Sequence, residues 1–86
     1  HFSNFMNIIA EKILKSQNID VDILNPLIKE TADKLNYLSP SEAQTGPAIR
    51  NDEITIQKHL NLLKETKYFE VYNRLTEEII KSKNEL

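Results

Sequence analysis

Apolar residues recur at helical spacing in four stretches of the chain, and alternation of apolar and polar residues never lasts beyond a few positions. The pattern predicts four main helices, over about residues 3–16, 22–37, 52–65 and 67–82. A single helical turn is expected at 41–44. No strand is predicted, so the expected fold class is all-α, a small bundle of four main helices.

Short polar residues stand where three of these helices should begin. Ser3 or Asn4 is expected to cap the first helix, because a short polar side chain accepts a hydrogen bond from the free N–H groups of a first turn. Asp52 is expected to cap the third helix for the same reason, and Thr66 the fourth. Each cap places a helix start to within a few residues.

The start of the second helix depends on Pro26. Proline is tolerated in the first turn of a helix and disrupts it further in. Either a short turn over 21–24 precedes a helix capped by Asn25, or one helix starts near Asp22 with the proline in its first turn. Both alternatives place a cap at an aspartate or asparagine and end the helix at about residue 37.

The segment between the second and third helices, residues 40–52, is the most unusual part of the chain. It holds two of the three prolines and the only glycine. Gly46 and Pro47 predict a tight turn, and Arg50 and Asp52 follow it at the start of the next helix. A turn that brings polar groups to a helix start can bind an anion or a polar ligand. The same segment can also be a plain helix–helix connection with a good cap.

Composition limits the class of protein. A chain of 86 residues makes one domain of modest stability, and without cysteine it has no disulfides. Eleven basic and thirteen acidic residues are interspersed, so no basic stripe predicts nucleic-acid binding. No apolar run is long enough to span a bilayer, and no signal peptide is visible. We expect a cytoplasmic protein that binds neither nucleic acid nor membrane.

The first residues suggest that the chain is part of a longer polypeptide. It starts with His1 and Phe2 rather than Met, and the first apolar pattern begins at once. We therefore expect a fragment cut at a domain boundary, with His1 either native or left over from a tag.

Several polar residues lie on or beside the apolar stripes, where burial is costly unless they are hydrogen-bonded. His59 is expected to be a partly buried, hydrogen-bonded histidine rather than a catalytic or metal-binding one. Asn4 either caps the first helix or lines a polar cleft with Asn7. Arg50 and Asp52 are expected to pair with each other or to cap the third helix. No metal site is predicted, because no carboxylate has histidine partners at ligand spacing.

Four blocks of the sequence stand out: Phe2–Asn7, Asn25–Thr31, Ala43–Asp52, and His59-Leu60 with Leu63. Together they resemble the C-terminal domain of a family of NAD(P)-dependent oxidoreductases, a domain of unknown function called DUF2520. The most specific part is Thr45–Asp52 within the third block. The family usually has glycine between the arginine and the aspartate, where this chain has Asn51, which tolerates a left-handed conformation.

The resemblance implies a division of labour in the full-length protein. An N-terminal Rossmann-like domain, absent from this chain, would hold NADP or NAD. Residues 1–86 would form a single helical domain, similar to those of 6-phosphogluconate dehydrogenase-like and pyrroline-carboxylate reductase-like enzymes, which forms a homodimer and closes a substrate cleft. It implies no cofactor-binding residue here and names no catalytic residue. The substrate-cleft candidates are Asn4, Asn7, Thr45, Arg50, Asp52 and His59.

Two hypotheses therefore remain. In the first, the chain is the dimerisation and substrate-cleft domain of an oxidoreductase and is inactive alone. In the second, it is a self-contained helical interaction module without a catalytic role, since each candidate residue also has a structural explanation. A small helical enzyme that acts alone is a third and weaker hypothesis.

Overall fold

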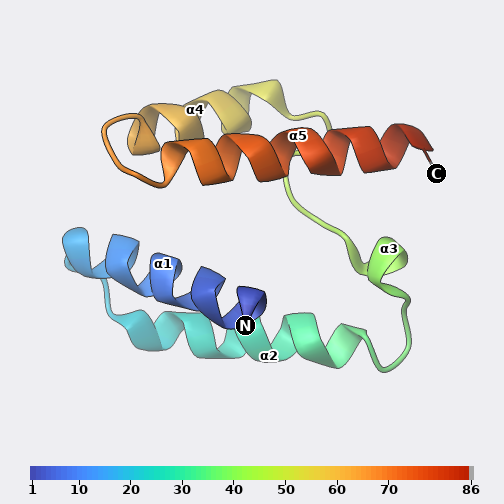
Figure 1. Ribbon diagram of the computed structural model, residues 1–86. Helices are drawn as coiled ribbons and strands as arrows, with labels where there is room; N and C mark the ends of the chain where they lie inside the picture. The colour runs from blue at the N-terminus through green and yellow to red at the C-terminus, as the bar shows by residue number, and fades with distance from the viewer. Residues whose placement is uncertain (86) are drawn as a thin grey trace. The chain divides into compact units, whose positions relative to one another are not determined.

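The computed structural model describes residues 1–85, which form two compact units, His1–Ala43 and the described residues from Gln44 onward. Figure 1 shows that each unit is built from helices. Among residues 1–85 there is no strand, and the predicted all-α fold with four main helices is confirmed. The elements are α1 (Phe2–Ser16), the 3₁₀ turn η1 (Val21–Ile23), α2 (Leu24–Lys34), α3 (Pro40–Ala43), α4 (Glu53–Leu63) and α5 (Phe69–Glu85).

In the first unit, α1 begins earlier than the caps predicted. Ser3 and Asn4 lie inside the helix, and the residue before it, His1, makes no capping side-chain bond. The prediction of a cap at Ser3 or Asn4 was therefore wrong. The helix begins at the apolar Phe2, before either of these residues. The helix ends as expected, at Ser16, with Gln17 as its C-cap, and Asn18 follows with a φ of 58°.

The start of α2 combines the two alternatives predicted around Pro26. A 3₁₀ turn over Val21–Ile23 comes first, and the carboxylate of Asp20 caps it by accepting the Asp22 N–H at 2.9 Å. The α-helix then starts at Leu24, so Pro26 is its third residue and lies in the first turn, where no N–H is needed. The predicted cap at Asn25 was wrong, and the helix ends at Lys34, earlier than predicted.

The short helix α3 is held by a reciprocal pair of side-chain bonds. The Ser39 N–H donates to the Glu42 carboxylate at 3.0 Å, and the Glu42 N–H donates to the Ser39 hydroxyl at 3.3 Å. This is a capping box with Pro40 at the first helical position. Hydrogen bonding to the carboxylate from Ser39, chiefly from its backbone N–H, holds the pKa of Glu42 below its ordinary value.

In the second unit, α4 and α5 lie side by side and run in opposite directions (Figure 1). Asp52 caps α4, as predicted. Thr66 does not stand directly before α5, which begins at Phe69. Its hydroxyl instead organises the connecting turn, because it donates to the Leu63 carbonyl at 2.8 Å and accepts the Tyr68 N–H at 3.2 Å.

Both units bury few side chains. Ile9 is buried in the first unit, and Ala48, Ile56 and Thr76 are buried in the second. Large apolar side chains remain exposed, most of them in the first unit. They include Phe2, Phe5, Met6, Ile8, Ile23, Leu27, Ile28, Leu35 and Tyr37 there, and Ile54, Leu62 and Leu75 in the second unit.

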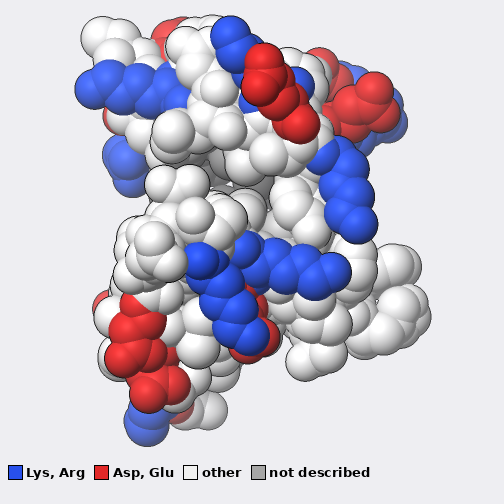
Figure 2. Space-filling view, turned by 90° about the vertical axis from the view of Figure 1, so that its left-hand side faces the viewer, with Lys and Arg blue, Asp and Glu red and all other residues white. Residues whose placement is uncertain are grey.

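Charged residues of both signs lie interspersed on the face shown in Figure 2, where blue and red side chains adjoin within each unit. Several of them form ion pairs within a helix, such as Lys34 with Glu30 on α2 at 3.7 Å. None of the helices described over residues 1–85 is both long enough and apolar enough to cross a membrane.

Candidate functional site

The segment that leads into α4 is an ordered turn. Gly46 has a φ of +106° and Asn51 a φ of +56°. The Asp52 N–H donates to the Pro47 carbonyl at 2.9 Å, which closes the turn around the buried Ala48. Asn51 thus adopts the left-handed conformation that the sequence suggested for it, and the chain enters α4 in one defined direction.

Asp52 is the best-connected polar residue of this turn. Its carboxylate accepts the Thr55 N–H at 3.1 Å and the Thr55 hydroxyl at 2.7 Å. These two bonds stabilise the ionised form, so they lower the pKa of Asp52 below its ordinary value of 3.8, with a smaller contribution from Arg50. Asp52 is therefore negatively charged at neutral pH and satisfied by the helix start.

Arg50 lies beside this carboxylate but is only loosely held by it. Its Nη2 is 3.9 Å from Oδ2 of Asp52, and its side chain is 60% exposed. The predicted pairing of Arg50 with Asp52 is thus confirmed. The pair leaves most of the guanidinium donors accessible, and a guanidinium can grip a carboxylate or phosphate with two parallel bonds.

Lys83, near the end of α5, completes the support of this turn. Its ammonium donates to the Ile49 carbonyl at 2.8 Å, across 34 positions of sequence. Sequence reasoning assigned no role to Lys83, and a lone lysine near a helix end carries no signal that identifies such a contact. The bond links the far end of α5 to the residue before Arg50.

His59 lies on α4 and contacts Tyr72 on α5. Its Nδ1 is 2.6 Å from the Tyr72 hydroxyl, and the two rings meet nearly edge to face at 84°, with centroids 5.5 Å apart. The predicted partly buried, hydrogen-bonded histidine is confirmed. The sequence did not identify Tyr72 as the partner, because Tyr72 lies at helical spacing among the apolar residues of the fourth predicted helix.

Burial raises the pKa of Tyr72 above its ordinary value of 10.0, and the hydroxyl of Thr76 beside it lowers the pKa to a lesser degree. The phenol is therefore protonated at neutral pH and has a proton to donate.

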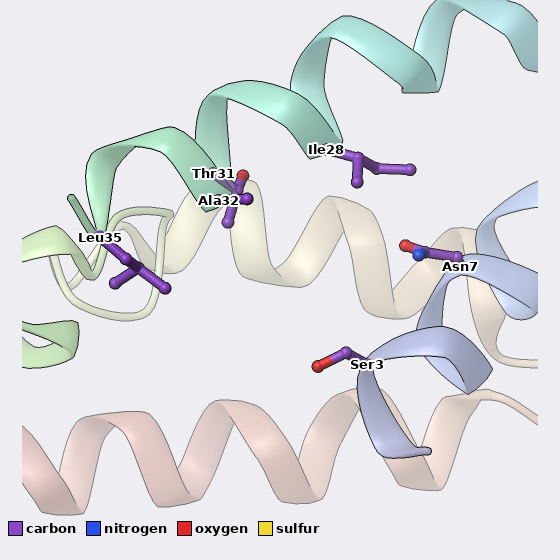
Figure 3. Close-up of a pocket in the computed structure, with 6 residues that line it drawn as sticks. All are labelled: Ser3, Asn7, Ile28, Thr31, Ala32 and Leu35. Carbon is purple, nitrogen blue, oxygen red and sulfur yellow. The ribbon is translucent and has the colours of Figure 1, made fainter.

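In the first unit, Asn7 lines a hollow between α1 and α2. The hollow has a volume of about 310 Å³. Figure 3 shows the side chains of Ser3 and Asn7 on one side and those of α2 on the other. Its lining residues are Ser3, Asn7, Ile28, Thr31, Ala32 and Leu35.

This hollow is lined by uncharged groups only. Asn7 contributes an amide, Ser3 and Thr31 contribute hydroxyls, and the Thr31 hydroxyl already donates to the Leu27 carbonyl at 2.9 Å. Asn4 is exposed and is not among the lining residues. Of the two asparagines predicted from the sequence, Asn7 is placed at this hollow and Asn4 is not.

Four of the predicted cleft candidates lie in the second unit, and the structure brings two of them into contact. Arg50 and Asp52 are in contact, and His59 lies seven residues after Asp52 on α4, which puts it on the same side of the helix about 10 Å along the axis. Thr45 is exposed, and its carbonyl accepts the side-chain amide of Gln44 at 3.1 Å.

No group of three or more His, Cys, Asp or Glu side chains is gathered for a metal ion in the part of the chain that the structure describes. Among the candidates of the second unit, Arg50 carries a positive charge and His59 an imidazole.

Comparison with known protein families assigns the chain to one of them. The family model described as a domain of unknown function, DUF2520, matches residues 1–79. The chain belongs to the DUF2520 family. The match covers the turn before α4 and the His59–Tyr72 pair, so both features described above lie inside the DUF2520 domain.

A solved structure agrees with this assignment. The DUF2520 chain is similar, at 42% identity and a TM-score of 0.88, to the crystal structure of a putative NADP oxidoreductase from Bacteroides fragilis. The similarity covers 93% of this chain and 32% of that one, so the DUF2520 chain spans about a third of that protein's length. No functionally curated protein matches the chain.

Proposed function

We propose that this DUF2520 domain is the dimerisation and substrate-cleft domain of an NADP- or NAD-dependent oxidoreductase and has no activity alone. The observation that carries the proposal is the similarity to the Bacteroides fragilis protein, which extends over 93% of this chain at 42% identity. Because the similarity covers only 32% of that protein, most of such an enzyme would lie outside the residues described above.

In this proposal the dinucleotide is bound mainly by another part of the natural polypeptide, an N-terminal Rossmann-like domain. Phosphate-binding turns of that fold need several closely spaced glycines, which let the backbone approach the pyrophosphate. Gly46 is the only glycine among the 86 residues, so this chain offers no such turn. The nicotinamide chemistry would come from the bound dinucleotide, and this domain would bind and orient the substrate.

Arg50 is the residue that we expect to bind a charged group of the substrate. Its side chain is 60% exposed, and its contact with Asp52 is long at 3.9 Å. The carboxylate orients the guanidinium without consuming its donors. A substrate with a carboxylate or phosphate would fit this geometry.

The remaining candidates would supply neutral hydrogen bonds. Asn7 lines the uncharged hollow of the first unit together with hydroxyl groups. His59 is held by Tyr72 in the second unit. Thr45 and Asn4 are exposed and stay candidates on the strength of the family resemblance only.

The exposed apolar residues of the first unit support the dimerisation part of the proposal. Phe2 is 77% exposed, Leu27 59% and Tyr37 73%. Soluble chains seldom leave several large apolar side chains on neighbouring helices uncovered, since covering them releases structured water. A second copy of the same protein would cover them, in a cytoplasmic enzyme without disulfides.

The proposal is tested with the Arg50→Ala variant of the natural full-length protein. NADPH oxidation is first screened against carbonyl and imine compounds, some with a carboxylate or phosphate and some without. We expect Arg50→Ala to fold normally, because an exposed pair at long distance adds little stability, and to lose turnover of the charged substrates.

Arg74→Ala is the matched control. Arg74 also pairs with a carboxylate, that of Glu78 at 3.1 Å, on an exposed part of α5. This variant should keep full turnover. If Arg50→Ala loses folding and Arg74→Ala does not, Arg50 is a structural residue and the interaction-module hypothesis is favoured.

A further inference from the structure

The contact between His59 and Tyr72 determines more than the packing of α4 against α5. An imidazole has two nitrogens, and in the neutral ring one carries a proton while the other accepts. Which nitrogen carries the proton is set by the hydrogen bond that the other one makes. The 2.6 Å contact is made by Nδ1, so the hydrogen bond with Tyr72 determines which tautomer of the neutral ring is present.

The phenol is the donor in this contact. A phenol is a far better proton donor than a neutral imidazole N–H, and an unprotonated imidazole nitrogen is a better acceptor than a phenol oxygen. The pKa of Tyr72 lies above its ordinary value of 10.0, so the phenol is protonated at neutral pH and its proton is available for this bond. Nδ1 of His59 is then the acceptor, and the ring proton lies on Nε2.

The other nitrogen of the ring reaches solvent. Every fully buried side-chain nitrogen or oxygen in residues 1–85 has a hydrogen-bond partner. The side-chain bond found for His59 goes through Nδ1, and the residue is only partly buried. Nε2 is therefore accessible and can meet a ligand.

We propose that Tyr72 is a positioning residue that holds His59 with its proton on Nε2, so that the imidazole offers a fixed hydrogen-bond donor to an oxygen acceptor of the bound ligand. Tyr72 itself does not touch the ligand. The fixed ring state is independent of the enzyme's reaction, whereas the ligand contact rests on the proposed substrate-cleft function. An acceptor such as a carbonyl or carboxylate oxygen would be recognised, and a donor group in the same place would be rejected.

The proposal is tested by the rate at which diethyl pyrocarbonate modifies His59, followed by mass spectrometry. The reagent acylates an unprotonated imidazole nitrogen, and in the proposed state the only such nitrogen, Nδ1, is occupied by the Tyr72 hydroxyl. In Tyr72→Phe the ring stays and the hydroxyl is lost. We expect the His59 rate to rise roughly fivefold, which corresponds to a hydrogen bond of about 1 kcal/mol.

Tyr68→Phe is the matched control, because it removes a hydroxyl from the same end of α5 without touching the contact with His59. It should leave the rate unchanged. The other histidine, His1, is exposed and serves as the internal reference in each sample. An unchanged His59 rate in Tyr72→Phe, or the same increase in Tyr68→Phe, would overturn the proposal.

A second measurement needs no variant. In protein labelled with ¹⁵N-histidine, the nitrogen that carries the proton shows a one-bond coupling to it. We expect this coupling on Nε2 of His59 at neutral pH, and its presence on Nδ1 would refute the proposal. Since neither experiment uses dinucleotide or substrate, the positioning role can fail while the oxidoreductase proposal stands, and the reverse also holds.

Discussion

The ammonium of Lys83 donates a hydrogen bond to the carbonyl of Ile49 at 2.8 Å, and so joins the end of α5 to the turn that precedes α4. The two residues are 34 positions apart, and the bond is one of the few side-chain contacts that span the second unit. It lies one residue before Arg50. A residue of α5 therefore contacts the backbone of the turn that contains Arg50.

Removing this bond should loosen the turn. We expect Lys83→Met to lower the free energy of unfolding by about 1 kcal/mol, since methionine keeps much of the side chain's apolar length and loses the donor. Lys81→Met is the control, because Lys81 makes only an exposed contact with Glu78 at 3.8 Å. Urea unfolding followed by circular dichroism measures both. Equal effects of the two changes would show that the bond to Ile49 adds nothing.

The core of the second unit gives the largest expected loss of stability. Ile56 is 4% exposed, whereas Ile54, two residues earlier on α4, is 73% exposed. Ile56→Ala should cost about 2–4 kcal/mol, because it leaves a cavity among packed side chains. Ile54→Ala removes the same atoms from the surface and should cost little. The same unfolding experiment compares the two variants. Similar losses of stability would contradict the difference in burial between Ile56 and Ile54.

The left-handed residue of the turn has a conformational requirement of its own. Asn51 has a φ of +56°, which asparagine and glycine tolerate and alanine does not. Asn51→Ala should lower the free energy of unfolding by about 1 kcal/mol, and Asn51→Gly, which restores the family's usual residue, should be close to neutral. If the Asn51→Ala and Asn51→Gly variants have the same free energy of unfolding, the left-handed conformation at residue 51 places no constraint on stability.

Asp52 should make the second unit sensitive to acid. Its pKa is lower in the folded chain than its ordinary value of 3.8, chiefly because Thr55 donates two hydrogen bonds to the ionised carboxylate. A carboxylate with a lowered folded pKa stabilises the fold above its ordinary pKa, and this stabilisation is lost as the pH falls through the folded pKa. Stability should therefore drop as the pH falls below the ordinary pKa of 3.8 and through the lowered pKa of Asp52 in the folded chain.

Asp52→Asn tests this dependence. Asparagine is also a good helix cap, so the variant should fold at neutral pH but lose part of the acid-dependent drop. Asp33→Asn, which removes an exposed carboxylate that pairs with Lys29 at 2.6 Å, is the control and should keep the drop. Urea unfolding at a series of pH values measures all three proteins. If Asp52→Asn retains the whole drop, the titration belongs to other groups.

The sequence predicted the fold class and the main helices because these depend on local periodicity. It also predicted the cap at Asp52, which follows from the preference of a single residue. The left-handed Asn51 agrees with the glycine that the resembling family usually has at that position. The first cap was wrong by a few residues because Phe2 extends α1 toward the terminus. Pro26 left two alternatives open, and the structure combines them.

Contacts between distant residues could not be predicted in the same way. The partner of His59 and the bond from Lys83 to Ile49 depend on how α4 and α5 pack, and a single sequence contains no record of that packing. The hollow beside Asn7 likewise requires α1 and α2 to lie together. The sequence thus identified individual candidate residues, whereas the residues that contact them could be identified only from the structure.

The measurement that tests the central claim most directly is a fluorescence titration of NADPH into the natural full-length protein and into residues 1–86 alone. If this DUF2520 domain is the substrate-cleft part of an oxidoreductase, the full-length protein binds NADPH with a dissociation constant in the micromolar range or below, and residues 1–86 show no comparable binding. If residues 1–86 alone bind NADPH as tightly, or if the full-length protein does not bind it, the division of labour proposed above is wrong.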